Sequence, residues 1–217
     1  MVATPVLSAF PDAGFPIQPR DASLGARRLL VCGRAGTGKT TVTNQLMRAG
    51  KGLCLVRDTP GIPVSGDASA ASQRLGPITG NDRAWITVEC RSGESMRRLL
   101  QAGRGARTAI WVVDPDQPLP QPGTWMRTAL AALGIRDVVL CVNRMDQVGF
   151  RQSRFDRLVD RYLQVALPAT AARLVAIPLV ATRGCNITRS CDEMTWYQGL
   201  PLARLLSVGP SSARTYG

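Results

Sequence analysis

From residue 27 onward, short apolar runs alternate with segments whose apolar residues recur at helical spacing. This alternation predicts a regular succession of strands and helices. We expect strands at 27–32, 52–57, 84–90, 108–114, 136–142 and 173–179. We expect helices at 40–49, 93–102, 124–133, 151–166 and 200–206. In segment 151–166 the helical period is clearest, and Pro168 follows it as a stop signal.

The order of these elements predicts an α/β fold with a mostly parallel sheet of about six strands and helices on both faces. Ligands of such sheets bind at the carboxyl ends of the strands. Residues 1–26 carry several prolines and no apolar period, so we interpret them as an irregular N-terminal extension. One domain is expected over 27–207, followed by a C-terminal tail at 208–217.

The strand expected at 27–32 leads directly into Gly33-Arg34-Ala35-Gly36-Thr37-Gly38-Lys39-Thr40, and a helix is expected to follow. This is the G-x-x-x-x-G-K-[S/T] pattern in the strand–loop–helix context that a phosphate-binding loop requires. The pattern predicts a P-loop NTPase; the alternative is a chance glycine-rich turn. Lys39 would contact the β- and γ-phosphates, and Thr40 would bind Mg²⁺. The predicted phosphate-binding residues are Gly33, Arg34, Ala35, Gly36, Thr37, Gly38, Lys39, Thr40 and Thr41.

Composition narrows the choice of function. The net charge of +12 invites a nucleic-acid interpretation, but the arginines are scattered and only 5% of residues are aromatic. We therefore favour an acidic protein partner over nucleic acid. The chain contains no histidine, which excludes a Ser-His-Asp triad and a histidine metal site. The 6 cysteines form no C-x-x-C pair and are interpreted as small buried hydrophobes, not as a disulfide frame or a zinc site. No membrane span or secretory signal is expected, and we predict a cytoplasmic location.

A second motif, Asn143-Arg144-Met145-Asp146, follows the strand expected at 136–142. It resembles the N-K-x-D motif of GTPases. A carboxylate at Asp146 can accept the N1–H and N2–H groups of guanine, which adenine does not present. Asn143 would brace the loop, and the plane of Arg144 could stack on the base in place of the usual lysine. Taken alone, this four-residue match also suits a polar loop.

Longer stretches resemble the GTPase subunit of bacterial sulfate adenylyltransferase, a relative of the elongation-factor-type GTPases, over roughly 27–206. The phosphate loop with its strand is similar to the start of that family, and 133–150 is similar to L-G-I-x-x-V-V-x-x-V-N-K-M-D-L-V-x-[F/Y]. Segment 178–199 resembles a stretch that runs from V-P-[I/L]-S-A to W-Y-x-G. The resemblance implies guanine contacts from Val180, Ala181 and Thr182, with the Ala181 N–H on the guanine O6, and Mg²⁺ with GTP as cofactor.

The family's D-x-P-G-H motif has two imperfect counterparts. Asp58-Thr59-Pro60-Gly61 matches the string but lies close to the phosphate loop, whereas the position of Glu89-Cys90-Arg91-Ser92-Gly93 fits the spacing. In the second alignment Glu89 and Arg91 are the catalytic candidates, and the histidine that positions water is replaced by Gly93. Thr79 is a second candidate Mg²⁺ ligand, in a first switch that is shortened or has lost its hairpin; it could equally be a solvated loop residue.

Three hypotheses follow. The first is a Mg-GTP-binding protein with slow hydrolysis linked to sulfate activation, whose partner is a sulfate adenylyltransferase catalytic subunit. The second is a non-hydrolysing GTP-binding regulatory or interaction protein, because the residues of the switch motifs have changed. The third is a P-loop kinase, which the Asn143–Asp146 motif opposes.

Overall fold

The computed structural model describes residues 27–49, 53–57, 85–89, 99–100, 103–118, 125–165 and 173–208. The strands are β1 (Arg27–Cys32), β2 (Leu53–Arg57), β3 (Trp85–Glu89), β4 (Thr108–Val113), β5 (Asp137–Val142) and β6 (Arg173–Pro178). The α-helices are α1 (Lys39–Ala49), α4 (Trp125–Ala132), α5 (Gln152–Val165) and α6 (Leu202–Val208). Each lies where the apolar pattern predicted an element. Of the helix expected at 93–102, only 99–100 is described, and it is helical.

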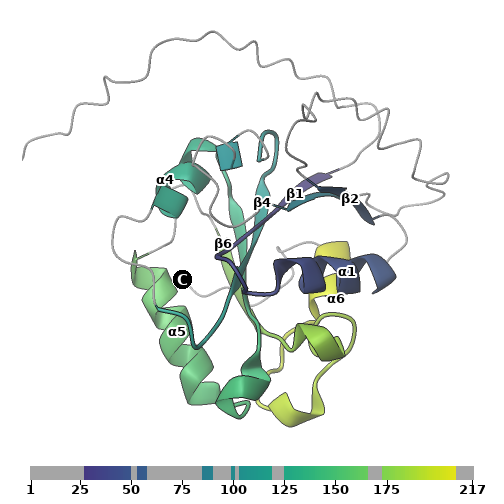
Figure 1. The fold of residues 1–217 in the computed structure, drawn as a ribbon, viewed down its shortest axis with the longest axis vertical. Helices are drawn as coiled ribbons and strands as arrows, with labels where there is room; N and C mark the ends of the chain where they lie inside the picture. The colour runs from purple at the N-terminus through teal and green to yellow at the C-terminus, as the bar shows by residue number, and fades with distance from the viewer. Residues whose placement is uncertain are drawn as a thin grey trace, which may run out of the picture.

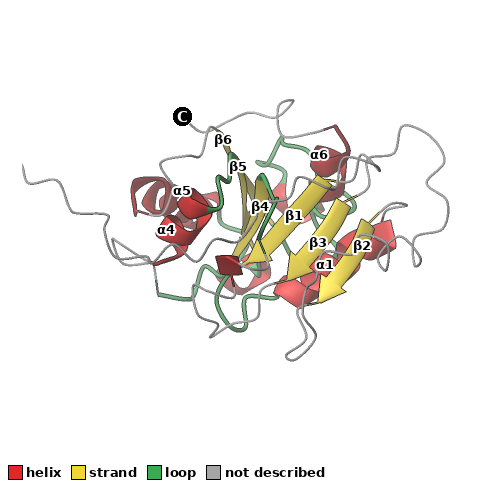
Figure 2. Cartoon of the chain, turned by 90° about the horizontal axis from the view of Figure 1, so that it is seen from above, coloured by secondary structure: helices red, strands yellow, loops and turns green. Residues whose placement is uncertain are grey.

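The strands form one six-stranded sheet in the order β2-β3-β1-β4-β5-β6, and every neighbouring pair is parallel. Figure 2 shows the strands side by side, with β1 near the middle and β2 at one edge. The prediction of a parallel α/β sheet is therefore confirmed. β2 pairs in parallel with β3, with Arg57 opposite Glu89, so these two strands form no hairpin.

Successive residues of a strand point to opposite faces of the sheet. Both faces carry apolar residues here, and helices cover both. On one face Leu30, Trp111 and Leu140 pack with α4 and α5. On the other face Leu29, Ile110 and Val139 pack with α1 and α6. The two helix pairs lie on opposite sides in Figures 1 and 2. A sheet covered in this way needs apolar residues at consecutive positions, and β4 is buried along its whole length.

α5 packs against the sheet through one stripe of apolar residues at helical spacing. Phe155, Leu158, Val159 and Tyr162 are all buried. The Tyr162 ring meets Trp111 of β4 edge to face at 5.1 Å between centroids, a favoured geometry for aromatic pairs. This contact fastens the helix to the middle of the sheet.

Three short 3₁₀ helices lie in the loops beyond the carboxyl ends of β5 and β6: η1 (Met145–Val148), η2 (Ala181–Arg183) and η3 (Asp192–Met194). Trp196, which follows η3, connects η3 and the residues after η1 to α5. Its indole N–H donates to the Phe150 carbonyl at 2.9 Å, and its ring centroid lies 5.4 Å from that of Phe155. Buried Asn186 donates to the Pro178 carbonyl at the end of β6. These bonds hold the loops rigidly against the sheet edge.

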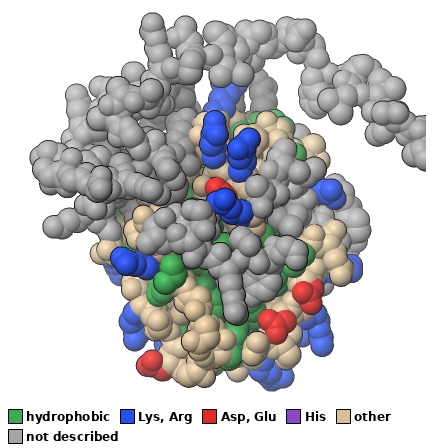
Figure 3. Space-filling view, turned by 180° about the vertical axis from the view of Figure 1, so that it is seen from behind, with side chains coloured by type: hydrophobic (Ala, Val, Ile, Leu, Met, Phe, Trp, Pro, Cys, Tyr) green, Lys and Arg blue, Asp and Glu red, His purple; other side chains and the backbone are tan. Residues whose placement is uncertain are grey.

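The surface carries its charge in several separate places. Figure 3 shows Lys and Arg side chains at the rim and in a small group near the top of one face, with acidic side chains among them. In the part of the chain that the structure describes, no helix is long and apolar enough to cross a membrane.

Candidate functional site

The loop between β1 and α1 follows a path that only glycine accepts at two points. Gly33 has φ 145°, and a Cβ there would lie 2.2 Å from the Val112 carbonyl oxygen. Gly38 has φ 88°, and its Cβ would lie 2.3 Å from the Asn143 amide nitrogen. Backbone in this region of φ with such close neighbours excludes other residues. The loop can therefore pass close to both β4 and β5 and end at the N-terminus of α1, where backbone N–H groups attract anions.

Lys39 is held over this loop. Its Nζ donates to the carbonyl oxygens of Gly33 at 3.0 Å and Arg34 at 2.7 Å, and the residue is buried. Thr37 also closes the loop, because its hydroxyl donates to the Arg34 carbonyl at 3.0 Å. A buried ammonium group beside the N-terminus of a helix is suited to an anionic ligand. Thr40 is exposed in the first turn of α1.

The segment that follows β4 packs against the outside of the loop. Gln117 Nε2 donates to the Ala35 carbonyl at 2.9 Å, and the Arg34 guanidinium donates to the Pro118 carbonyl at 3.2 Å. Neither contact involves Gly33 or Gly38, so the contacts hold the loop from its exposed side. The pattern analysis did not select Gln117, although its place after the carboxyl end of a strand could have suggested it.

Asn143 joins the phosphate loop to the loop after β6. Its amide nitrogen donates to the Thr37 carbonyl at 2.8 Å, and its Oδ1 accepts the Ala181 N–H at 2.9 Å. Asn143 is only 3% exposed, so both bonds are sheltered from water. The bracing role predicted for Asn143 agrees with this geometry. The Ala181 N–H, expected to meet guanine O6, here donates to Asn143, and its contact with a base stays a prediction.

The Arg144 side chain forms an ion pair at the rim of the pocket, and its stacking on a base stays a prediction. Its backbone is left-handed, at φ 63°, and its guanidinium pairs with the Asp114 carboxylate at 2.8 Å. The Asp114 side chain is 3% exposed, and its other oxygen accepts the Asp116 N–H. A buried carboxylate needs such partners. The pair thus links the end of β4 to the loop after β5, and Asp114 was missed because an acidic residue after an apolar run is a weak signal.

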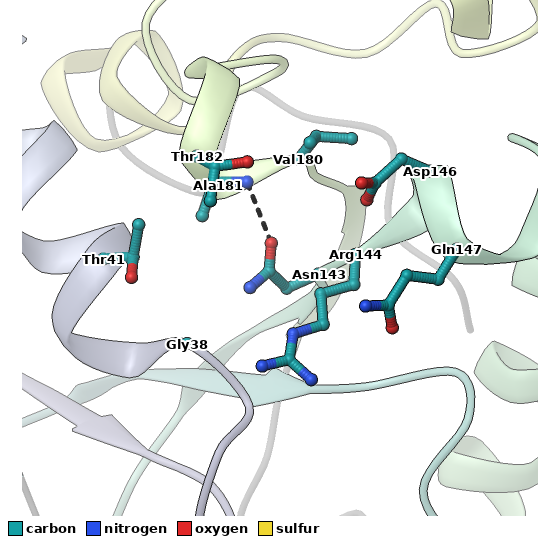
Figure 4. A pocket seen from close by; sticks show the side chains of 9 residues that line it. All are labelled: Gly38, Thr41, Asn143, Arg144, Asp146, Gln147, Val180, Ala181 and Thr182. Atoms are coloured by element: carbon teal, nitrogen blue, oxygen red, sulfur yellow. Dashed lines mark hydrogen bonds between the residues drawn. The ribbon is translucent and has the colours of Figure 1, made fainter.

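These loops enclose a pocket of about 320 Å³ at the carboxyl edge of the sheet. Its lining residues are Gly38, Thr41, Asn143, Arg144, Asp146, Gln147, Val180, Ala181 and Thr182. Figure 4 shows Asp146 on η1 facing the Val180–Thr182 loop across the pocket, with Gly38 and Thr41 at the opposite end. The structure therefore brings together the three segments that the motifs singled out. Gln147 is an additional lining residue.

Of the residues proposed for the switch motifs, the structure describes only Glu89. Glu89 is the last residue of β3 and pairs in register with Val31 of β1, so its backbone reaches the same sheet edge as the phosphate loop. Asp58–Gly61, Thr79, Arg91, Ser92 and Gly93 lie outside the described residues. The choice between the two switch alignments therefore stays open.

The arrangement is similar to the folds of GTP-binding proteins of known structure. The crystal structure of Sup35 complexed with GDP matches with a TM-score of 0.54 and 17% identity, over 84% of this chain and 44% of that one. The apo structure of the elongation factor SelB from Methanococcus maripaludis matches with a TM-score of 0.51 and 17% identity, over 88% and 34% of the two chains. These likenesses define the fold.

Sequence comparison then identifies the homology. The chain is 27% identical over 207 residues to sulfate adenylyltransferase subunit 1 of Methylorubrum populi (84% of this chain, 44% of that protein). It is 28% identical over 213 residues to the same subunit of Bacteroides fragilis (87% and 45%). It is 33% identical over 115 residues to the bifunctional enzyme NodQ of Rhizobium tropici (53% and 18%). The chain is thus a distant homologue of sulfate adenylyltransferase subunit 1, as the motifs predicted.

Two further findings bound this homology. No protein-family model matches the sequence. The chain also spans less than half the length of the subunit 1 relatives it matches, 44% of the Methylorubrum protein and 45% of the Bacteroides protein.

Proposed function

We propose that this protein binds Mg-GTP in the pocket between the phosphate loop and η1. The observation that carries the proposal is the position of Asn143, which is hydrogen-bonded to Thr37 of the phosphate loop and to Ala181 at the other end of the pocket. One nucleotide could then contact the phosphate loop with its phosphates and the Asp146 end with its base. The homology to a GTPase subunit supports the same ligand.

The choice of guanine depends on Asp146. This carboxylate is exposed in the pocket, and Figure 4 shows it on the wall opposite Gly38. An ionised carboxylate accepts hydrogen bonds and cannot donate. It therefore suits the N1–H and N2–H pair of guanine and repels the N1 acceptor of adenine. If the bound base shields this carboxylate from water, pairing of this kind discriminates by roughly 10⁴-fold.

Mg²⁺ binding and GTP hydrolysis are separate parts of the proposal. Thr40, exposed in the first turn of α1 beside Lys39, is the residue that would ligate Mg²⁺. When bound, the ion neutralises charge on the phosphates. Hydrolysis also requires a positioned water, and the chain has no histidine to hold one. We therefore infer slow turnover at most, on the scale of about 10⁻⁴ s⁻¹ of unassisted GTPases.

The second candidate function is a binding protein that does not hydrolyse GTP, favoured by the absence of histidine from the sequence. The homology supports a finer form of the first candidate function. In this form, GTP hydrolysis is linked to sulfate activation, and the partner is a catalytic sulfate adenylyltransferase subunit in the cytoplasm. Phosphate release in multiple turnovers, with or without that partner, decides between the two.

Titration calorimetry with GTP, GDP and ATP, each with Mg²⁺, tests binding. We expect micromolar or tighter guanine-nucleotide binding and far weaker ATP binding. Asp146→Asn should weaken GTP binding about a hundredfold or more, because an amide cannot accept both guanine donors. Lys39→Ala should abolish binding of the phosphates.

The matched control is Asp156→Asn, the same change at an exposed position on α5 away from the pocket. It should bind GTP as the unaltered protein does. Equal affinity for GTP and ATP, or an Asp146→Asn variant that binds GTP normally, would contradict the proposed base site.

A further inference from the structure

A cluster of two thiols and a carboxylate lies beside the pocket, outside the proposed nucleotide site. The Sγ atoms of Cys185 and Cys191 and a carboxylate oxygen of Glu193 all lie within 4.8 Å of one another. Both cysteines are buried and free, while Glu193 is exposed. Their spacing, C-x₅-C-x-E, differs from the C-x-x-C pattern, so the sequence alone did not reveal the cluster.

The backbone around the cluster is firmly held. Cys185 forms a two-way bridge with Val180, with N···O distances of 3.2 and 3.3 Å, and a second bridge with Arg189. Cys191 precedes η3, and its carbonyl accepts the Met194 N–H at 3.1 Å. Buried, bridged backbone holds the two sulfurs near each other before any ligand arrives.

The side chains already interact. The Cys191 thiol donates to the second Glu193 oxygen at 3.2 Å, and the first oxygen pairs with the Arg183 guanidinium. The cluster therefore contains a carboxylate oxygen that can bind a cation and a thiol proton that a cation can displace.

We propose that Cys185, Cys191 and Glu193 form a binding site for a zinc-type divalent cation. Thiolate sulfur and carboxylate oxygen are ligands that Zn²⁺ accepts, at about 2.3 Å and 2.0–2.2 Å. Two sulfurs on a tetrahedral ion lie roughly 3.8 Å apart at those bond lengths. Because the ligand atoms already lie within 4.8 Å of one another, the side chains need to move only a little closer together to bind an ion.

Ion binding would proceed by exchange of protons for metal. Each thiol loses its proton to solvent as its sulfur binds the ion, and the Glu193 oxygen that accepted the Cys191 S–H turns to the ion. Within the described residues the cluster contains three such ligands, so water would complete a tetrahedron. The bound ion would connect the end of η2 to η3.

Cobalt titration of the reduced full-length protein tests the site, because Co²⁺ bound to thiolate absorbs visibly and Zn²⁺ displaces it from such sites. We expect one Co²⁺ per chain with thiolate absorption, lost in Cys185→Ala/Cys191→Ala. The matched control is Cys32→Ala/Cys141→Ala, which removes two buried thiols from β1 and β5 and leaves the cluster intact. It should keep the absorption.

A variant at an exposed ligand tests the site even if the variant that lacks both buried cysteines fails to fold. Glu193→Gln changes an exposed side chain and should weaken Co²⁺ and Zn²⁺ binding by roughly 10- to 100-fold. Zn²⁺ should also raise the melting temperature of the unaltered protein and not that of Cys185→Ala/Cys191→Ala. Equal thiolate absorption in both double variants, no thiolate absorption in the unaltered protein, or unchanged affinity in Glu193→Gln would each overturn the proposal.

Discussion

Asn143 joins the loops on two sides of the pocket through the two polar atoms of its side chain. It is almost fully buried, and its two amide atoms satisfy a carbonyl of the phosphate loop and an N–H of the loop after β6. An unsatisfied buried group costs about 1–3 kcal/mol. The side chain therefore supports both the stability of the loops and the shape of the pocket.

We predict that Asn143→Ala lowers the free energy of unfolding by about 2–4 kcal/mol, because it leaves the Thr37 carbonyl and the Ala181 N–H without their partner. Urea unfolding followed by circular dichroism measures this. Gln164→Ala removes an amide from an exposed position on α5 and should change stability by less than about 0.5 kcal/mol. Equal losses in the two variants would show that Asn143 is not the link described here.

At the scale of elements, the loops around the pocket depend on the contact of Trp196 with α5. Trp196 follows η3, donates to the Phe150 carbonyl beyond η1, and packs on Phe155 of α5. One side chain thus connects a helix with two of the short 3₁₀ helices.

We predict that Trp196→Phe costs about 1 kcal/mol, because it keeps a ring and loses the hydrogen bond. Trp196→Ala should cost about 3 kcal/mol or more, since it also removes the aromatic packing. Guanidinium unfolding of both variants measures the two steps, with Leu200→Ala, a change at an exposed side chain, as the control. Similar losses for Phe and Ala would contradict the packing role.

The elements themselves were predictable because their signals are local. Apolar runs located all the strands, and the stripe from Phe155 to Tyr162 located α5. The pairing of Arg144 with Asp114 and the approach of Cys191 to Cys185 depend on side-chain directions across separate loops. Residue spacing carries no information on those directions. The parallel pairing of β2 with β3 also depends on the path of the chain rather than on either strand.

At the scale of the whole molecule, a ligand that bridges the phosphate loop and η1 should stabilise the folded chain as one unit. A ligand at a hundred times its dissociation constant adds about 2.7 kcal/mol. For a chain of this size that corresponds to a rise in melting temperature of roughly 5–10 °C. We predict such a rise with Mg-GTP, measured by calorimetric or fluorescence melting.

Asp146→Asn at the same GTP concentration should lose most of this rise, whereas inorganic phosphate with Mg²⁺ should give little in either protein. A rise that phosphate alone reproduces would indicate anion binding at the loop without base recognition.

The all-parallel sheet also has a consequence for synthesis of the chain. β1 lies between β3 and β4, and Arg27 finds its first strand partner at Trp85. At about 5–20 residues per second, the ribosome needs several seconds to make that partner. During this interval the apolar residues of β1 have no sheet to join, and no early hairpin can shelter them. The apolar residues of β1 therefore stay available to chaperones until the chain has been made as far as β3.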